Sequence, residues 1–135
     1  TEIKKISRDA DVILTGKVLR QHCLWNKNKT KIFTNVTVEV EEYLKGSRSD
    51  KNILITHPGG EIGEIGEWYS HTPGFKDDEE VLLFLRKDSK NDIYKVVNGE
   101  DGKLSLHTDK KTGEKITSSH VAVSVLKKEI ENVLK

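Results

Sequence analysis

Residues 31–46, KIFTNVTVEVEEYLKG, decide the fold because their side chains alternate in polarity with the period of a β-strand. The opposite face of this strand is mostly polar apart from Phe33. Such alternation is typical of an antiparallel sheet with one buried and one solvated face. The face expected to be buried carries five residues: Ile32, Thr34, Val36, Val38 and Val40.

The preceding segment, ADVILTGKVL at residues 10–19, alternates in the same way and is joined to the first stretch by a polar loop at 26–31. Gly16 lies in the middle of this earlier strand, 10–19. A glycine within a strand usually marks a bulge or a sharp bend, which a sheet needs in order to close on itself. The two strands therefore favour a closed barrel over a flat sheet.

The rest of the chain completes one mainly β domain spanning residues 1–135, with a short helix or extension over 1–9 and a helix over 118–135. Residues 79–86, EEVLLFLR, predict a strand that is buried on both faces. Shorter strands are expected over 52–57, 92–97 and 103–108. Ser118 or Ser119 is expected to cap the last helix. Its apolar stripe is expected to pack on Leu82 and Phe84 and consists of Ala122, Val125, Leu126, Ile130 and Val133.

The composition argues against several classes of partner. The 23 Lys and Arg residues nearly balance the 22 Asp and Glu residues, and the net charge is +1. Binding of nucleic acid usually needs a basic surface, so we expect no nucleic-acid partner. The single cysteine, Cys23, excludes an internal disulfide framework, and no apolar run approaches the ~20 residues of a membrane-spanning helix.

Short motifs carry a resemblance to a known family. The Ala10-Asp11-Val12-Ile13 opening and the Leu44-Lys45-Gly46 ending of the next strand resemble the corresponding strands of netrin-like domains, the family that includes tissue inhibitors of metalloproteinases. The aliphatic segment 81–85 is similar to a later strand of that family. The chain also resembles a set of uncharacterised exported bacterial domains, which share segments 59–60, 73–75, 79–85 and 102–103 in the same order.

This resemblance implies a closed five-stranded OB-like barrel with a terminal helix and an exported location. It does not carry over an inhibitory mechanism. Tissue inhibitors of metalloproteinases bind the protease zinc through an N-terminal cysteine, whereas this sequence begins with Thr1 and contains only Cys23.

Two histidines are the first candidates for chemistry. His57 and His71 flank a glycine-rich stretch and, with Glu61, Glu64 or Glu67, could supply nitrogen and oxygen ligands for zinc. No HxH or HxxxH spacing supports such a site, and the alternative is two solvent-facing loop histidines. A catalytic Cys23 is a further alternative, although a lone cysteine late in a strand is more often a small buried apolar residue.

The most informative candidate site lies in the irregular segment 58–78, where Trp68, Tyr69, His71 and Phe75 occur together. Segments of this length without periodicity are often functional, and Trp and Tyr are favoured contact residues. The alternative is that Trp68 or Phe75 folds back and fills one end of the barrel. The Glu-Ile-Gly repeat within 60–67 favours a hairpin over a phosphate-binding loop, because its carboxylates would repel phosphate.

We therefore expect a non-enzymatic, exported, monomeric binding module that uses no cofactor or metal and contacts a protein or glycan through residues 58–78. Two alternatives stay open. One is a metal-dependent hydrolytic enzyme centred on His57 and His71. The other is an oligonucleotide-binding OB domain that stacks bases on Phe33.

Overall fold

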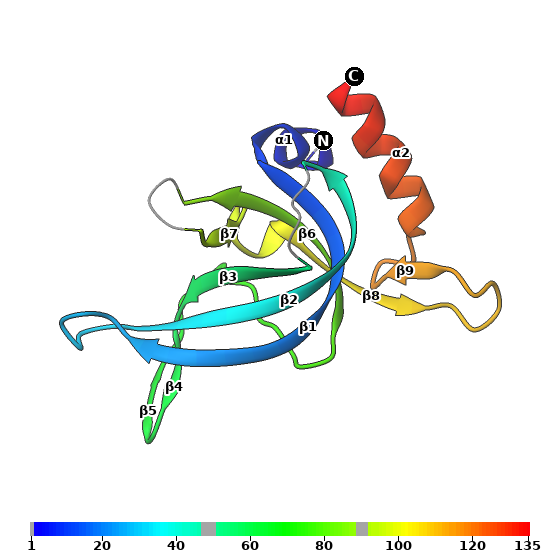
Figure 1. The fold of residues 1–135 in the computed structure, drawn as a ribbon. Helices are drawn as coiled ribbons and strands as arrows, with labels where there is room; N and C mark the ends of the chain where they lie inside the picture. Colours follow the sequence, from blue (N-terminus) through cyan, green and yellow to red (C-terminus); the bar gives the residue numbers. More distant parts are fainter. Residues whose placement is uncertain (1, 47–50, 89–91) are drawn as a thin grey trace.

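The structure, a computed structural model, describes residues 2–46, 51–88 and 92–135. The polar sequence SRSD at 47–50 predicts a turn before the next strand, but it lies outside these residues. Figure 1 shows the elements along the chain. They are α1 (Glu2–Asp9), β1 (Val12–Trp25), β2 (Ile32–Lys45), β3 (Asn52–Pro58), β4 (Gly60–Ile62), β5 (Ile65–Glu67), β6 (Glu80–Lys87), β7 (Tyr94–Val96), the 3-10 helix η1 (Gly99–Gly102), β8 (Lys103–Thr108), β9 (Lys115–Thr117) and α2 (Val123–Leu134).

Five strands close into a barrel in the order β1–β2–β3–β7–β6, and β6 pairs back onto β1. The β3–β7 pair is parallel and joins Ile55 to Tyr94, whereas the other pairs of the barrel are antiparallel. β8 pairs with β6, and β9 pairs with β8 beyond the barrel. The predicted fold class, a closed five-stranded OB-like barrel with a C-terminal helix, is confirmed.

Gly16 bends β1 as the sequence predicts. The register between β1 and β2 shifts between Thr15 and Gly16. A Cβ atom at Gly16 would overlap the carbonyl oxygen of Glu39 and lie 2.8 Å from Cγ1 of Val38. Only glycine therefore lets the two strands approach this closely at the bend.

The barrel interior is filled by the faces that alternation predicts. Thr34, on the apolar face of β2, is 3% exposed, and Val36 and Val38 are fully buried. The inward-facing side chains of the five barrel strands together remove a continuous apolar surface from water. This burial is the main source of stability in such a barrel. The buried residues of this core are Val12, Leu14, Val18, Val36, Val38, Ile53, Ile55, Phe75, Val81, Leu83, Leu85 and Tyr94.

A second apolar core lies outside the barrel, where α1 and α2 cover the outer face of β6 (Figure 1). Leu82 and Phe84 contribute to it from β6, so the predicted partner of the terminal helix is confirmed. Both faces of β6 are buried for this reason, in agreement with its apolar sequence. The other buried residues of this core are Ile6, Ala10, Ile13, Val97, Leu106, Val123, Leu126 and Ile130.

The start of the terminal helix was predicted wrongly. α2 begins at Val123, and its N-cap is Ala122 without a side-chain cap, rather than Ser118 or Ser119. The residues before it form β9 and a turn, in which the His120 N–H donates to the Thr117 carbonyl at 2.9 Å. The buried face of α2 consists of Val123, Leu126 and Ile130, whereas Val125, which was expected in the apolar stripe, is 51% exposed.

The two motifs behind the family resemblance meet at the α1 end of the barrel. The Lys45 ammonium donates hydrogen bonds to the carbonyl oxygens of Ser7, Arg8 and Ala10 at 2.9, 3.3 and 2.5 Å. These carbonyls lie at the C-terminal end of α1, where a cation is favoured. On the other motif, the Asp11 carboxylate accepts a hydrogen bond from the Lys87 N–H at 2.8 Å.

Within the described residues, none of the helices is long and apolar enough to cross a membrane.

Candidate functional site

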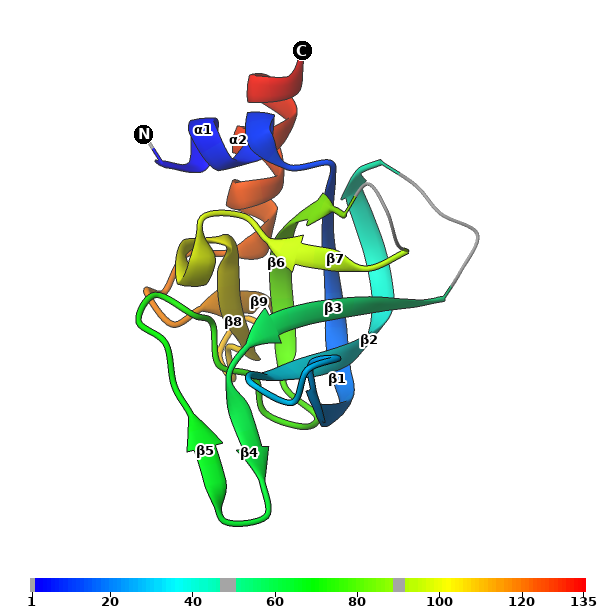
Figure 2. The ribbon, with the colours of Figure 1, turned by 90° about the vertical axis from the view of Figure 1, so that its left-hand side faces the viewer.

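Residues 58–78 begin with a hairpin that projects from the barrel (Figure 2). β4 and β5 form a two-stranded antiparallel sheet, with Ile62 opposite Ile65 at its outer end. The hairpin that the Glu-Ile-Gly repeat predicts is therefore present. The rest of the segment, after β5, lies within the described residues and contains no strand before β6.

Three hydrogen bonds anchor the base of the hairpin to β2. The Gly59 N–H donates to the Ile32 carbonyl at 2.9 Å, and the Thr34 hydroxyl donates to the Gly59 carbonyl at 2.8 Å. The Glu67 carboxylate accepts from the Ile32 N–H at 2.8 Å. Both strands of the hairpin are thus tied to the barrel, which reduces the conformational entropy that binding would otherwise cost.

Trp68 and Tyr69 follow the hairpin and are open to solvent. Trp68 is 77% exposed, and its ring lies over Gly66, where an added Cβ atom would come within 2.8 Å of the ring. Tyr69 is 42% exposed and donates a hydrogen bond to the Glu67 carboxylate at 3.1 Å. This hydrogen bond, with smaller contributions from burial and from the negative charge of Glu67, raises the pKa of the Tyr69 hydroxyl. At neutral pH Tyr69 is a neutral hydroxyl whose ring can contact a partner.

Phe75 lies in the barrel core and is only 8% exposed. Its ring stacks on His57, with 5.9 Å between the ring centroids and 17° between the planes. The Lys103 ammonium lies 5.0 Å from the Phe75 centroid. Of the two residues expected as a possible filling of the barrel end, Phe75 takes this place and Trp68 does not.

An ion pair keeps Phe75 in position. Lys103 contacts both carboxylate oxygens of Glu79, at 2.9 and 3.0 Å, and also donates to the Gly74 carbonyl. Ser105 donates to the same carboxylate at 2.5 Å. Burial alone would raise the pKa of Glu79, but the hydrogen bonds from Ser105, Lys103 and the Lys76 N–H lower it. Glu79 is therefore charged and ties the end of the segment to β8.

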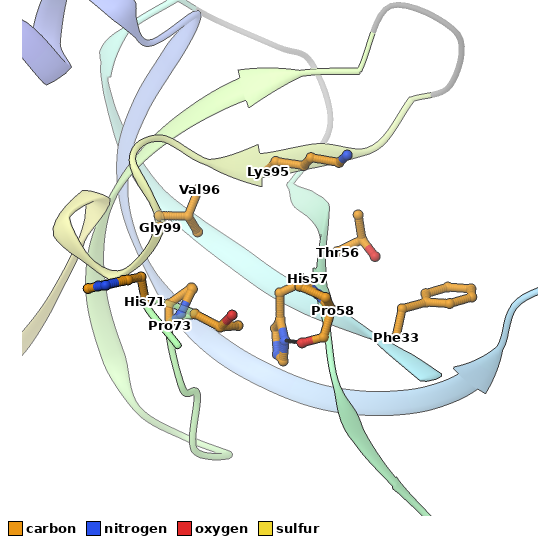
Figure 3. Close-up of a pocket in the computed structure, with 10 residues that line it drawn as sticks. Phe33, Thr56, His57, Pro58, His71, Pro73, Lys95, Val96 and Gly99 are labelled. Carbon is orange, nitrogen blue, oxygen red and sulfur yellow. Dashed lines mark hydrogen bonds between the residues drawn. The ribbon is translucent and has the colours of Figure 1, made fainter. Parts of the chain in front are cut away.

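His57 and His71 line one cavity of about 440 Å³, which we call the β3–β7 cavity. Figure 3 shows the His71 ring directed away from His57. The His57 Nδ1 lies 2.9 Å from the Pro58 carbonyl and therefore donates to it, whereas Nε2 is buried without a partner in the described part of the chain. Burial lowers the pKa of His57 despite that hydrogen bond, so the ring is neutral at pH 7. The other lining residues are Phe33, Thr56, Pro58, Thr72, Pro73, Lys95, Val96 and Gly99.

The rings of His57 and His71 do not converge on a common point (Figure 3). His71 has a positive φ of 61°, and its Nδ1 lies 3.7 Å from the Glu100 carboxylate at the surface. Among the described residues, no three or more His, Cys, Asp or Glu side chains are grouped so that they could share a metal ion. Cys23 is a free, half-buried thiol whose Sγ lies 3.5 Å from the Thr34 hydroxyl.

A second cavity of about 390 Å³, the hairpin cavity, lies next to the first and adjoins Trp68 and Tyr69. The segment Thr72–Pro73 contributes to the walls of both cavities. The structure thus brings Trp68, Tyr69 and Phe75 to the hairpin cavity and places His71 at the β3–β7 cavity. The candidate residues surround neighbouring hollows rather than one site.

Two features of this region were not found from the sequence. Ile65 is 52% exposed on the hairpin, and its place in the Glu-Ile-Gly repeat could have indicated this. Lys95 reaches the β3–β7 cavity from a distant part of the chain, through the parallel pairing of β3 with β7. No local pattern predicts that pairing, because it joins residues far apart in the sequence.

No protein-family model matches the sequence, and a search of curated proteins finds no significant relative.

Proposed function

We propose that the protein is an exported, non-enzymatic binding module that holds a protein or glycan partner against residues 58–78. The observation that carries this proposal is the exposure of Trp68 and Tyr69 directly after a hairpin that is hydrogen-bonded to the barrel. The exported location rests on the family resemblance alone.

The distribution of exposed apolar side chains supports this surface. Among the described residues, five large apolar side chains are prominently exposed, and Ile65, Trp68 and Tyr69 all belong to segment 58–78. The other two, Val125 and Leu134, lie on α2. Exposed aromatic residues gathered in one place indicate a contact surface more strongly than isolated ones do. Trp and Tyr side chains that become buried when a complex forms contribute most of the binding energy in many interfaces.

The charge of the hairpin favours a protein partner with basic residues. Residues 60–67, GEIGEIGE, contain three glutamates and no basic residue. Glu61 and Glu64 are exposed on the hairpin. A complementary partner would present Lys or Arg beside an apolar side chain that contacts Trp68.

Photo-crosslinking tests this proposal. A crosslinking residue at position 64 of the otherwise intact chain should capture one partner, whereas the same residue at position 125 on α2 should not. In the Trp68→Ala, Tyr69→Ala double variant, capture from position 64 should fall at least tenfold while the unfolding midpoint stays unchanged. Val125→Ala serves as the control, because it also removes exposed apolar surface.

Undiminished capture by the double variant would refute the proposal. A glycan array probed with the native chain, the Trp68→Ala, Tyr69→Ala double variant and the Val125→Ala control determines whether the partner is a protein or a glycan. Saturable glycan binding that depends on Trp68 and Tyr69 would identify the partner as a glycan rather than a protein.

A further inference from the structure

The β3–β7 cavity has the character of a small-molecule site. Its volume of about 440 Å³ is within the ~300–1,000 Å³ typical of ligand pockets. The walls are mostly apolar and include Phe33, Pro58, Pro73 and Val96. None of the described residues that line the β3–β7 cavity is acidic. Lys95 is the lysine or arginine among them. Trp68 and Tyr69 do not line this cavity, although Pro58, His71, Thr72 and Pro73 of the proposed contact segment do.

Lys95 lies between this apolar cavity and a smaller, more polar one. Figure 3 shows Lys95 extending along the edge of the β3–β7 cavity from β7. The other cavity, of about 300 Å³, lies between β7 and α1, and Lys95 and Val96 line both. Lys5 and Arg86 add positive charge to the smaller cavity, whose acidic lining residue is Asp9.

Arg86 and Lys95 place two positive charges side by side on this face. Arg86 and Lys95 are directly opposite each other in the β6–β7 pair, and like charges in such positions repel. Arg86 donates to the main-chain carbonyl of Asp9 at 3.3 Å. Within the described parts of the chain, neither Arg86 nor Lys95 has a carboxylate within ion-pair distance. An anion placed here would relieve the repulsion.

We propose that this face binds an amphipathic carboxylate, with its apolar body in the β3–β7 cavity and its carboxylate over β7 between Lys95 and Arg86. The apolar walls provide most of the binding energy through burial of the ligand's hydrocarbon part. The two cations determine the sign of the head group and the direction in which the ligand lies.

Three probes with the full 135-residue chain test this site by NMR titration. Octanoate combines an alkyl chain with a carboxylate, 1-octanol lacks the charge, and acetate lacks the apolar body. Octanoate should give saturable shifts at the amides of Thr56, Lys95, Val96 and Gly99. Octanol and acetate should each bind more weakly by at least threefold.

Variants separate the two parts of the site. Lys95→Ala should weaken octanoate binding roughly three- to tenfold, as expected for loss of a partly exposed charged contact, and leave octanol binding unchanged. Phe33→Ala should weaken both alkyl ligands. Lys110→Ala, in the turn between β8 and β9, is the matched control and should change neither. The Trp68→Ala, Tyr69→Ala double variant should bind octanoate normally.

The proposal is overturned if octanoate shifts no amide around the β3–β7 cavity, or if Lys95→Ala binds it as tightly as the native chain. Equal affinity for acetate and octanoate would reduce the site to a plain anion site and would also overturn it. Loss of octanoate binding in the Trp68, Tyr69 double variant would assign the ligand to the hairpin instead.

Discussion

Replacement of Lys45 by methionine tests how the N-terminal helix is held on the barrel. The Lys45 ammonium donates to the carbonyls of Ser7, Arg8 and Ala10, whereas a methionine side chain has nearly the same length and no donor. Hydrogen bonds to a charged group contribute about 1.5–3 kcal/mol, and a cation at a helix C-terminus contributes about 0.3–1 kcal/mol. Because Lys45 is only half-buried, we expect a loss of about 2 kcal/mol in the free energy of unfolding.

Urea unfolding and hydrogen exchange together measure this effect. A loss of about 2 kcal/mol corresponds to a fall of about 5–10 °C in Tm for a chain of this size. The amides of α1 should exchange much faster, because release of α1 also uncovers Ile6 and Ala10 from the second core. Lys17→Met is the control. Lys17 lies 3.9 Å from an exposed Asp78 carboxylate, a pair that contributes less than about 0.5 kcal/mol. If Lys45→Met matched Lys17→Met in stability and in α1 protection, this account of the helix would be wrong.

Two further predictions concern the barrel and its pH dependence. Gly16→Ala should lower the free energy of unfolding by about 1–3 kcal/mol in urea, because the added methyl group overlaps the Glu39 carbonyl, whereas Gly74→Ala, which meets open space, should change it little. Stability should also fall in two steps on acidification, measured by urea unfolding from pH 8 to pH 3. Burial lowers the pKa of His57, so the unfolded chain binds this proton more readily than the folded one, and stability falls as the pH drops below the ordinary value of 6.5. An NMR titration of the folded protein should place the midpoint of His57 below that value. The lowered pKa of Glu79 contributes stability that is present above 4.5 and lost below it, so Glu79→Gln should abolish the second step, and a profile unchanged by that variant would contradict the assignment.

The sequence predicts best where the structure depends on local periodicity. β1, β2, β6 and β8 follow from alternating or continuous apolar runs, and the bend at Gly16 follows from the glycine itself. β9 and the true start of α2 were missed, because three residues are too few to show a period. The apolar residues around Val123 fit a helix from either starting point.

The candidate site was predictable only in part, for a related reason. The exposure of Trp68 and Tyr69 agrees with their place in a polar, glycine-rich segment. The burial of Phe75 depends on its contacts with His57 and Lys103, which are distant in the sequence. A local pattern does not distinguish an aromatic residue that contacts a partner from one that fills the barrel, because both occur in the same kind of segment.

The short motifs at 10–13 and 44–46 lie at one end of the long hairpin of β1 and β2, where their contacts are structural. Asp11 and Lys45 lie at the end of these strands that meets α1, where they hold β6 and the helix. Ile32 and Thr34, at the start of β2, anchor the β4–β5 hairpin. This hairpin projects from the side of the barrel away from α1 (Figure 2). The motifs at the first end therefore have structural roles in this barrel. A partner or ligand would contact the other end and the face of β7, so binding can differ between chains that share these motifs.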